Sequence, residues 1–284
     1  MNRIAHMVRL AADPVEIFAR ALPRRAEPEP WQVDVLRGFP DGGGSGTLIS
    51  GPGSVNRLML VASRQTGKTS TTAALLAHRM ITDLGPDGRG CLCVALAPTL
   101  RTAVELLGKV RVHLAAIGVE FAQDSAMALS LTGLGSRCVA LPGTPVSARG
   151  WSSVSLAAID EAAFVDQLAY QALRPTLINS GGDLVMLTSA GHEGSWAHGI
   201  WAGDSQGWTK VSVPWHACPR FAARPEEINE LRASMPKHVF ESEMECRWGS
   251  PGAQVFDAAA VTAALRDASD IDLPTIVPLS ASAA

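Results

Sequence analysis

The sequence predicts a three-layer α/β domain in which helices cover both faces of a mainly parallel sheet, followed by a small helical lid. Short apolar runs of strand length recur at 57–63, 91–97, 154–160 and 183–189. Segments with helical spacing of apolar residues alternate with these runs, which is typical of a parallel sheet buried on both faces. From about Pro214 the alternation stops, and two charged amphipathic segments follow.

The N-terminal part of the chain is predicted to be helical. Residues 1–20 have the pattern of an amphipathic helix that is broken near Asp13-Pro14. Residues 15–37 are expected to form helices on either side of a proline-rich break at 27–30, because proline disrupts a helix interior. The glycine-rich stretch at 38–56 is expected to be a surface loop.

Within the core, the first two strands are each followed by a predicted helix, at 71–81 and 99–117, and residues 138–141 form a shorter strand. After the core, two helices without an intervening strand would form a lid packed on it. These patterns divide the chain into an N-terminal helical segment (1–37), a glycine-rich loop (38–56), the core (57–213), a helical lid or linker (214–257) and a tail (258–284).

The composition allows a packed core but shows no sign of a broad basic face. The 284 residues are 47% hydrophobic and 18% charged, with a formal net charge of −3 and a pI of about 6.2. A protein that coats nucleic acid is usually basic, so any contact with DNA is expected to be local or shared among several subunits. The sequence also lacks the long apolar run of a membrane-spanning helix.

The five cysteines do not form a recognisable metal or disulfide pattern. No pair has C-x-x-C spacing, and the odd number argues against a disulfide framework. They are expected to be buried free thiols, with Cys91 and Cys93 facing the same side of one strand. The cysteines are Cys91, Cys93, Cys138, Cys218 and Cys246.

The strongest local motif is Ala62–Thr69, directly after one apolar strand and directly before a helix. It matches the phosphate-loop pattern G-x-x-x-x-G-K-[ST], except that alanine replaces the first glycine. Backbone N–H groups of such a loop surround phosphate groups. Lys68 is expected to reach the β- and γ-phosphates of ATP, and the Thr69 hydroxyl to bind Mg²⁺. The expected contacts are Ser63, Gln65, Thr66, Gly67, Lys68, Thr69 and Ser70.

A carboxylate pair, Asp160-Glu161, ends the apolar run at 154–160. An aspartate at the C-terminal end of such a strand can hold Mg²⁺, and the adjacent glutamate can orient and polarise the attacking water. The competing interpretation is that Asp160 caps a helix N-terminus. A helix cap does not explain a second carboxylate in a chain that also has a phosphate loop, so the catalytic interpretation is favoured.

Two weaker signals complete the candidate site. Thr188 and Ser189 end the next strand, where small hydroxyl side chains could sense the γ-phosphate and pass its loss to neighbouring elements. An ordinary strand-to-loop turn explains them equally well. Gln32 lies upstream of the glycine-rich loop, and its amide could pair with the N6 and N7 edge of adenine.

Taken in order, these motifs resemble the ATPase domain of the large terminase subunit, the motor of viral genome packaging. Pro30-Trp31-Gln32 resembles the adenine-recognising motif of that family, and Ser63–Thr69 resembles its variant Walker A loop. The resemblance covers about 13–257. The further matching segments are A-P-T at 97–99, S-A-R-G-W at 147–151, A-A-I-D-E-A at 157–162, L-T-S-A at 187–190, F-E-S-E-M-E-C-R-W at 240–248 and G-A-Q-V-F at 252–256.

The resemblance implies a Mg²⁺-dependent ATP hydrolase with the RecA-like (ASCE) fold of the P-loop NTPases, in which the coupling strand lies between the phosphate-loop strand and the Walker B strand. It implies a ring of subunits of a bacteriophage enzyme, which acts with the portal protein and the small terminase subunit. The ring would work in the host cytoplasm on the procapsid, driving double-stranded DNA inward. Arg64 would contact the γ-phosphate within its own subunit. Arg101 would reach a neighbour's nucleotide, and Arg111, Arg149 and Arg174 compete for that role.

Large terminases usually continue into an RNase-H-like nuclease, and only 27 residues follow Asp257 here. Asp267, Asp270 and Asp272 cannot supply that domain, so this chain alone is not expected to cut DNA. The main alternative is a helicase or translocase-type nucleic-acid-dependent ATPase. Such enzymes need a second RecA-like domain, and no strand alternation follows Val213. A non-catalytic nucleotide-binding regulator would not need Glu161, and a small-molecule kinase fits Glu161 and Thr188-Ser189 less well.

Overall fold

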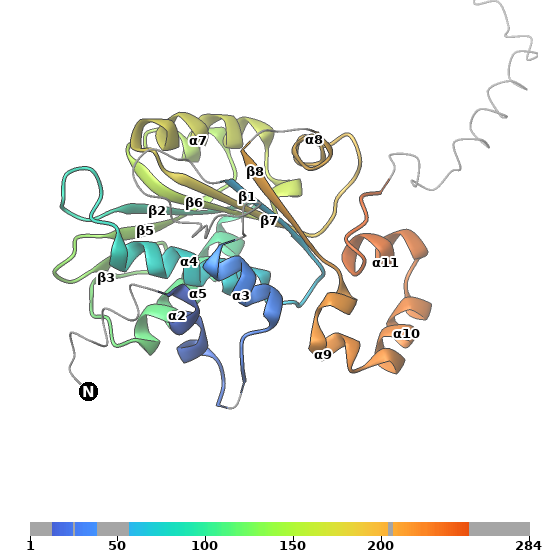
Figure 1. The fold of residues 1–284 in the computed structure, drawn as a ribbon. Helices are drawn as coiled ribbons and strands as arrows, with labels where there is room; N and C mark the ends of the chain where they lie inside the picture. The colour runs from blue at the N-terminus through green and yellow to red at the C-terminus, as the bar shows by residue number, and fades with distance from the viewer. Residues whose placement is uncertain (1–12, 25, 39–56, 204–206, 250–284) are drawn as a thin grey trace, which may run out of the picture. The chain divides into compact units, whose positions relative to one another are not determined.

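The structure, a computed structural model, describes residues 13–24, 26–38, 57–203 and 207–249 (Figure 1). One compact unit extends to Gly249 and includes the lid helices. Outside the described residues lie the predicted helix over residues 1–12, the glycine-rich loop after Gly38, and the predicted tail.

In the described part of the chain, the central sheet has eight strands in the order β3-β4-β5-β2-β6-β7-β1-β8. In the part of this order that runs β5-β2-β6-β7-β1-β8, all neighbouring strands are parallel, whereas β3-β4 and β4-β5 pair antiparallel. The mainly parallel α/β sheet is therefore confirmed. The strands are β1 (Arg57–Ala62), β2 (Leu92–Ala97), β3 (Phe121–Asp124), β4 (Ala128–Leu131), β5 (Arg137–Pro142), β6 (Val154–Asp160), β7 (Asp183–Thr188) and β8 (Trp208–Val213).

The predicted position of β7 between β1 and β6 is confirmed. Leu60 of β1 is in register with Leu187 of β7, and Met186 of β7 with Ile159 of β6. Because these three strands run parallel, their carboxyl ends lie at one edge of the sheet. That edge is where ligands bind in open α/β folds.

Helices cover both faces of the sheet, which gives the predicted three layers (Figure 1). One face packs against α4 (Lys68–Thr82) and α5 (Leu100–Ala116), with α2 (Pro14–Ala21) and α3 (Pro30–Arg37) outside them. The opposite face packs against α6 (Pro145–Ala148), α7 (Gln167–Ser180) and α8 (Trp196–Ala202). A buried apolar cluster lies on each side, as expected for strands that are apolar on both faces.

The lid follows β8 and consists of short helices. After the 3₁₀ turn Trp215–Ala217 come α9 (Pro219–Ala222), α10 (Pro225–Ser234) and α11 (Lys237–Glu243). Its small core contains Ile228, Phe240 and Met244. The two predicted charged helices correspond to α10 and α11 and are confirmed, whereas α9 was not predicted.

Three features differ from the sequence-based expectation. Strand β8 was not predicted, because it lies at the sheet edge and is mostly half-buried, so it has no continuous apolar run. The antiparallel pair β3-β4 was also missed, since β3 is largely exposed. Pro30 does not belong to the break but opens α3, where proline is well tolerated because the first helical N–H has no partner within the helix.

The cysteine prediction is confirmed. All five are buried free thiols, and the sulfur atoms of Cys91 and Cys93 lie 3.9 Å apart on one side of the chain. None of the helices in the described ranges combines the length and the apolar character needed to cross a bilayer.

Candidate functional site

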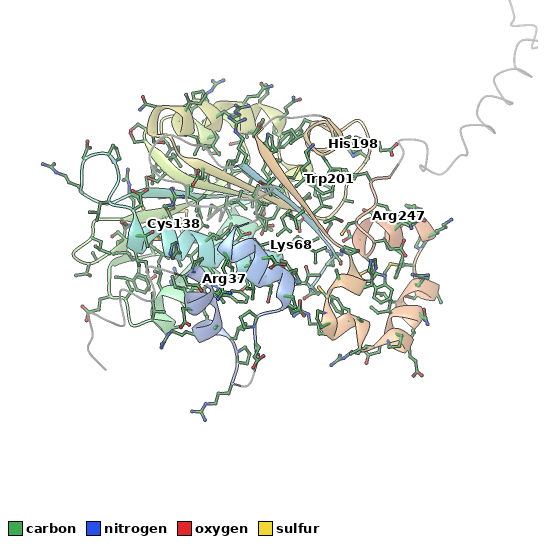
Figure 2. The ribbon with its side chains drawn as sticks, in the orientation of Figure 1. Arg37, Lys68, Cys138, His198, Trp201 and Arg247 are labelled. Carbon is green, nitrogen blue, oxygen red and sulfur yellow. The ribbon has the colours of Figure 1, made fainter. Side chains whose placement is uncertain are left out.

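The candidate site lies where β1, β7 and β6 end. The loop Ser63–Gly67 leaves β1 and leads directly into α4, whose first residue is Lys68 (Figure 2). Asp160 is the last residue of β6, and Ser189 follows β7. The fold therefore brings three predicted motifs together from positions far apart in the sequence.

Internal hydrogen bonds hold the phosphate loop in shape. The hydroxyl of Thr66 donates to the carbonyl of Ser63 over 2.8 Å, and the hydroxyl of Thr71 donates to the carbonyl of Gly67 over 3.2 Å. The backbone N–H and the hydroxyl of Ser63 each donate to the carbonyl of Val213 over 3.0 Å. The loop is therefore tied both to itself and to the end of β8.

The loop needs a left-handed backbone at Gln65 (φ 60°) and Gly67 (φ 92°), where only glycine avoids a steric penalty. By contrast, Ala62 is the last residue of β1 and has no left-handed φ. Alanine therefore fits where the consensus phosphate loop has its first glycine.

Lys68 is the central cation of the site. Its side chain is only 8% exposed, and its Nζ lies 3.5 Å from Oε1 of Glu161. It also donates to the hydroxyl of Ser189 over 3.4 Å. One ammonium group thus contacts the ends of two strands at the place where a polyphosphate would sit.

Asp160 is buried at the bottom of the site, and this raises the pKa of its carboxyl to about 6; the neighbouring Glu161 carboxylate contributes to the rise. The nearby Lys68 ammonium and a hydrogen bond from the Thr69 hydroxyl oppose it. The backbone N–H of Glu161 also donates to Oδ1 of Asp160 over 2.9 Å. The two predicted metal-binding residues, Thr69 and Asp160, therefore lie close enough to interact.

Glu161 has a left-handed backbone, with φ 49° and ψ 47°. This conformation is costly for a residue with a side chain, and such strain is found most often at functional sites. The Glu161 side chain remains about one-third exposed while it contacts Lys68. It is therefore accessible to water and held by a cation at the same time.

The two hydroxyl residues at the end of β7, Thr188 and Ser189, face different partners. Ser189 contacts Lys68, as described. The hydroxyl of Thr188 instead accepts from the N–H of Ala163 over 3.3 Å, next to the acidic pair, and donates to the carbonyl of Ser189. The following carbonyl, that of Ala190, accepts a hydrogen bond from Ser242 of α11. This strand end therefore contacts both the site and the lid.

Gln32 lies beside the phosphate loop and is 5% exposed. Its Oε1 accepts from the N–H of Glu29 over 2.9 Å. A Cβ placed on Gly67 would lie 3.1 Å from the Gln32 Nε2. The predicted adenine-contacting residue is thus on the same side of the domain as Lys68.

Some predicted residues have other partners. Arg64 is paired with Glu243 of the lid, with 3.3 Å between Nε and Oε2. The hydroxyl of Ser70 lies 3.3 Å from Nε2 of His113 on α5. Arg101 is exposed and lies 3.5 Å from Glu105 of its own helix.

The residues that compete with Arg101 fall into two groups. Arg111 is paired with Asp124 at 2.6 Å, and Arg174 lies over the ring of Tyr170. Arg149 is exposed at the end of α6. Sequence reasoning missed Arg220 of α9, which belongs to no motif and whose Nη2 donates to the carbonyl of Gln65 over 2.5 Å.

Comparison with protein families shows what this arrangement belongs to. Residues 59–262 match the family model described as "Terminase large subunit, T4likevirus-type, N-terminal". The chain belongs to the large terminase family. A search of curated proteins finds no match for this terminase chain.

Solved structures of phage terminases share the fold. A variant of the ATPase domain of the Thermus phage P74-26 large terminase has a TM-score of 0.57 and 15% identity, covering 78% of this chain and 94% of that one. The HK97 bacteriophage large terminase has a TM-score of 0.60 and 16% identity, covering 84% and 55%. The large terminase of a thermophilic bacteriophage in complex with ADP has a TM-score of 0.59 and 11% identity, covering 83% and 52%. This terminase chain thus spans about half the length of the two larger proteins.

The buried Asp160 leads to a prediction about stability. Its pKa is higher in the folded chain than the ordinary 3.8, so the folded chain binds the proton more tightly. Stability should therefore decline as the pH rises from about 4 to about 6, where the unfolded chain loses this proton first.

Asp160→Asn removes the charge and keeps the shape. At pH 7 we expect this variant to raise the free energy of unfolding by about 1–3 kcal/mol in the absence of divalent metal. Urea unfolding at pH 7 and at about pH 4, where the carboxyl is mostly protonated and the difference should vanish, measures the effect. An Asp160→Asn chain that is less stable than the wild type at pH 7 would contradict it.

Proposed function

We propose that this terminase chain hydrolyses ATP at the Lys68–Asp160–Glu161 site and uses the energy to move double-stranded DNA into a procapsid. The observation that carries the proposal is the contact of Lys68 with both Glu161 and Ser189. One cation on the phosphate loop then links the reacting phosphate, the candidate base and the strand end that contacts the lid.

In this proposal the phosphate loop binds the nucleotide, and the acidic pair supplies the groups for hydrolysis. Backbone N–H groups at the start of α4 and the Lys68 ammonium hold the phosphates, because a helix N-terminus with a neighbouring cation favours anions. Glu161 orients a water molecule for attack on the γ-phosphate and accepts its proton. Phosphoryl transfer needs mainly positioning and electrostatic stabilisation, which these groups supply.

The donor set fits Mg²⁺. The Thr69 hydroxyl and the Asp160 carboxylate lie close enough to interact, and both are oxygen donors of the kind that Mg²⁺ prefers alongside phosphate oxygens. Burial of Asp160 without a cation raises its pKa, so a bound cation would favour the charged form. When bound, Mg²⁺ would neutralise charge on the β- and γ-phosphates. ADP and ATP-γ-S were each bound in structures of the thermophilic phage terminase.

Family membership supports the proposed partners. They are double-stranded DNA, the portal protein, the small terminase subunit and further copies of this chain in a ring, with the procapsid in the host cytoplasm as the place of action. Arg101 and Arg149 are the candidates to reach a neighbour's nucleotide, because both side chains are exposed. Arg111 and Arg174 are half-buried and are held against Asp124 and Tyr170. Arg64 would have to leave Glu243 to contact the γ-phosphate in its own subunit.

One experiment tests the proposed function as a whole. Phosphate release from ATP is measured with and without double-stranded DNA and procapsids, beside the same chain carrying Glu161→Ala. We expect DNA and procapsids to stimulate the wild-type activity and the variant to lose it. An activity that is independent of both, or that survives Glu161→Ala, would reject the proposal.

Ser189→Ala tests the coupling of hydrolysis to movement. The change removes the hydroxyl that contacts Lys68 but leaves the ion pair with Glu161. We expect ATP affinity to stay within about twofold, as for loss of one weak hydrogen bond, while the length of DNA packaged per ATP falls.

Ser242→Ala removes the lid contact with the carbonyl of Ala190. It should also reduce the length of DNA packaged per ATP, without altering the nucleotide site. Packaged length and phosphate release are measured in one packaging reaction. An unchanged ratio in Ser189→Ala would mean that Ser189 is only a turn residue.

A further inference from the structure

Arg220 joins the lid to two parts of the nucleotide site. It lies on α9, and its Nη2 donates to the carbonyl of Gln65 in the phosphate loop over 2.5 Å. Its Nε lies 3.3 Å from Oε1 of Glu29, which directly precedes α3. A single guanidinium group thus contacts Glu29 and Gln65, which both precede Arg220 by more than 150 residues and are more than thirty residues apart from each other.

Glu29 is a mostly buried carboxylate that pairs with this cation. Its side chain is 13% exposed, and its Oε2 accepts from the indole N–H of Trp31 over 2.7 Å. Burial, and then the Glu29 carboxylate, raise the pKa of the nearby Cys218 thiol to about 12. A shielded carboxylate that loses its cationic partner is strongly disfavoured, so Arg220 fixes the position of Glu29.

Glu29 in turn fixes the amide of Gln32. The N–H of Glu29 donates to Oε1 of Gln32, which sets which end of the amide is oxygen and leaves Nε2 beside Gly67. A Cβ on Gly67 would lie 3.1 Å from that Nε2 and 3.8 Å from Nη2 of Arg220. Gln32 and Arg220 therefore flank Gly67 together.

We propose that Arg220 is a positioning residue for base recognition, which holds the Glu29–Gln32 segment in register with the phosphate loop so that the Gln32 amide can read adenine. The proposal rests on the proposed ATPase function and adds a specificity role for the lid. A glutamine amide pairs with N6 and N7 of adenine only in one orientation. When the lid moves α9, it also moves the group that sets this orientation.

The geometry of the guanidinium group makes a sharp comparison with lysine possible. Arg220 uses two nitrogens for two partners at once, and a lysine ammonium on a flexible stem cannot reproduce this planar fork. Arg220→Lys should therefore keep the charge near Glu29 but lose the simultaneous contact with Gln65.

The test measures affinity for Mg²⁺ complexes of ATP, GTP and inorganic tripolyphosphate in the wild type, Arg220→Ala, Arg220→Lys and Arg247→Ala. Arg247 is the matched control, because it is a lid arginine that likewise has two partners, the carboxylates of Glu241 and Glu245. We expect Arg220→Ala to lose about tenfold in ATP affinity, as for one charge-assisted contact, and to narrow the ATP-to-GTP preference by a similar factor. Tripolyphosphate has no base, so its affinity should change less than about twofold.

Arg220→Lys should show the same narrowed preference for ATP over GTP, with an unchanged melting temperature. If the alanine variant is unstable, this lysine variant separates a positioning role from a role in folding. Arg247→Ala should match the wild type. Equal losses for ATP and tripolyphosphate, or an unchanged preference in both Arg220 variants, would overturn the role of Arg220 and leave the ATPase proposal standing. A wild-type chain that binds ATP and GTP with equal affinity would also overturn the role of Arg220 without affecting the ATPase proposal. If the wild type binds none of the three ligands, the proposed function itself fails.

Discussion

Lys68→Ala is expected to abolish ATP turnover and to reduce ATP affinity below the measurable range. Lys68 is the buried cation in contact with Glu161 and Ser189, and no water can replace it without loss in a shielded site. Removal of one preorganised electrostatic contact of this kind lowers turnover by about 10²–10³-fold, and loss of phosphate binding adds to it. Phosphate release and binding of a fluorescent ATP analogue measure the two effects.

Lys109→Ala provides the matched control, because Lys109 is an exposed lysine on α5. It should behave like the wild type in both measurements. Lys68→Ala has a second consequence, because Lys68 opposes the rise in the pKa of Asp160. That pKa should rise further in the variant. Wild-type turnover in Lys68→Ala would remove the phosphate-loop assignment.

Glu161→Gln is expected to separate binding from hydrolysis. The amide keeps the size of the side chain and the left-handed backbone at this position, but it cannot accept a proton from water. We expect ATP to bind in the presence of Mg²⁺ while hydrolysis slows by at least about 10²-fold, the contribution of a positioned general base. Equilibrium binding and single-turnover hydrolysis, measured on the same preparation, give the two numbers.

Removal of the negative charge should also alter affinity in a predictable direction. Glu161 lies 3.5 Å from Lys68 and competes with the phosphates for that cation. ATP is therefore expected to bind the glutamine variant at least as tightly as the wild type. If Glu161→Gln and Asp160→Asn both bound and hydrolysed ATP normally, the catalytic pair would lie elsewhere.

The sequence was sufficient to predict which short motifs at strand ends the fold brings together at one edge of the sheet. Lys68, Thr69, Asp160 and Glu161 each follow or end an apolar run, and parallel strands necessarily bring such positions to one edge. The position of β7 between β1 and β6 came from resemblance rather than from periodicity, and the register confirms it. Gln32 was a weak signal alone, and its place beside Gly67 depends on the packing of α3 against α4.

The residues that the sequence did not reveal act through tertiary contacts. Arg220 lies in a four-residue helix with no motif, and its partners are a backbone carbonyl and a glutamate far away in the chain. The pairing of Arg64 with Glu243 likewise depends on where the lid packs. Strand β8 has an ordinary mixed composition at a sheet edge, so only its backbone pairing with β1 identifies it.

That pairing has a mechanical consequence. Strand β8 runs parallel to β1 from Arg57↔Trp208 to Ala62↔Val213, and the chain then passes through Pro214 into the lid. Tension applied to the lid along the strand would load all the hydrogen bonds between β8 and β1 together in shear, because these bonds lie across the direction of pull. The two hydrogen bonds from Ser63 to Val213 lie at the loaded end. A pull on the lid against the opposite, Arg57 end of β1 would therefore be carried by the whole ladder of hydrogen bonds at once, rather than by one bond after another.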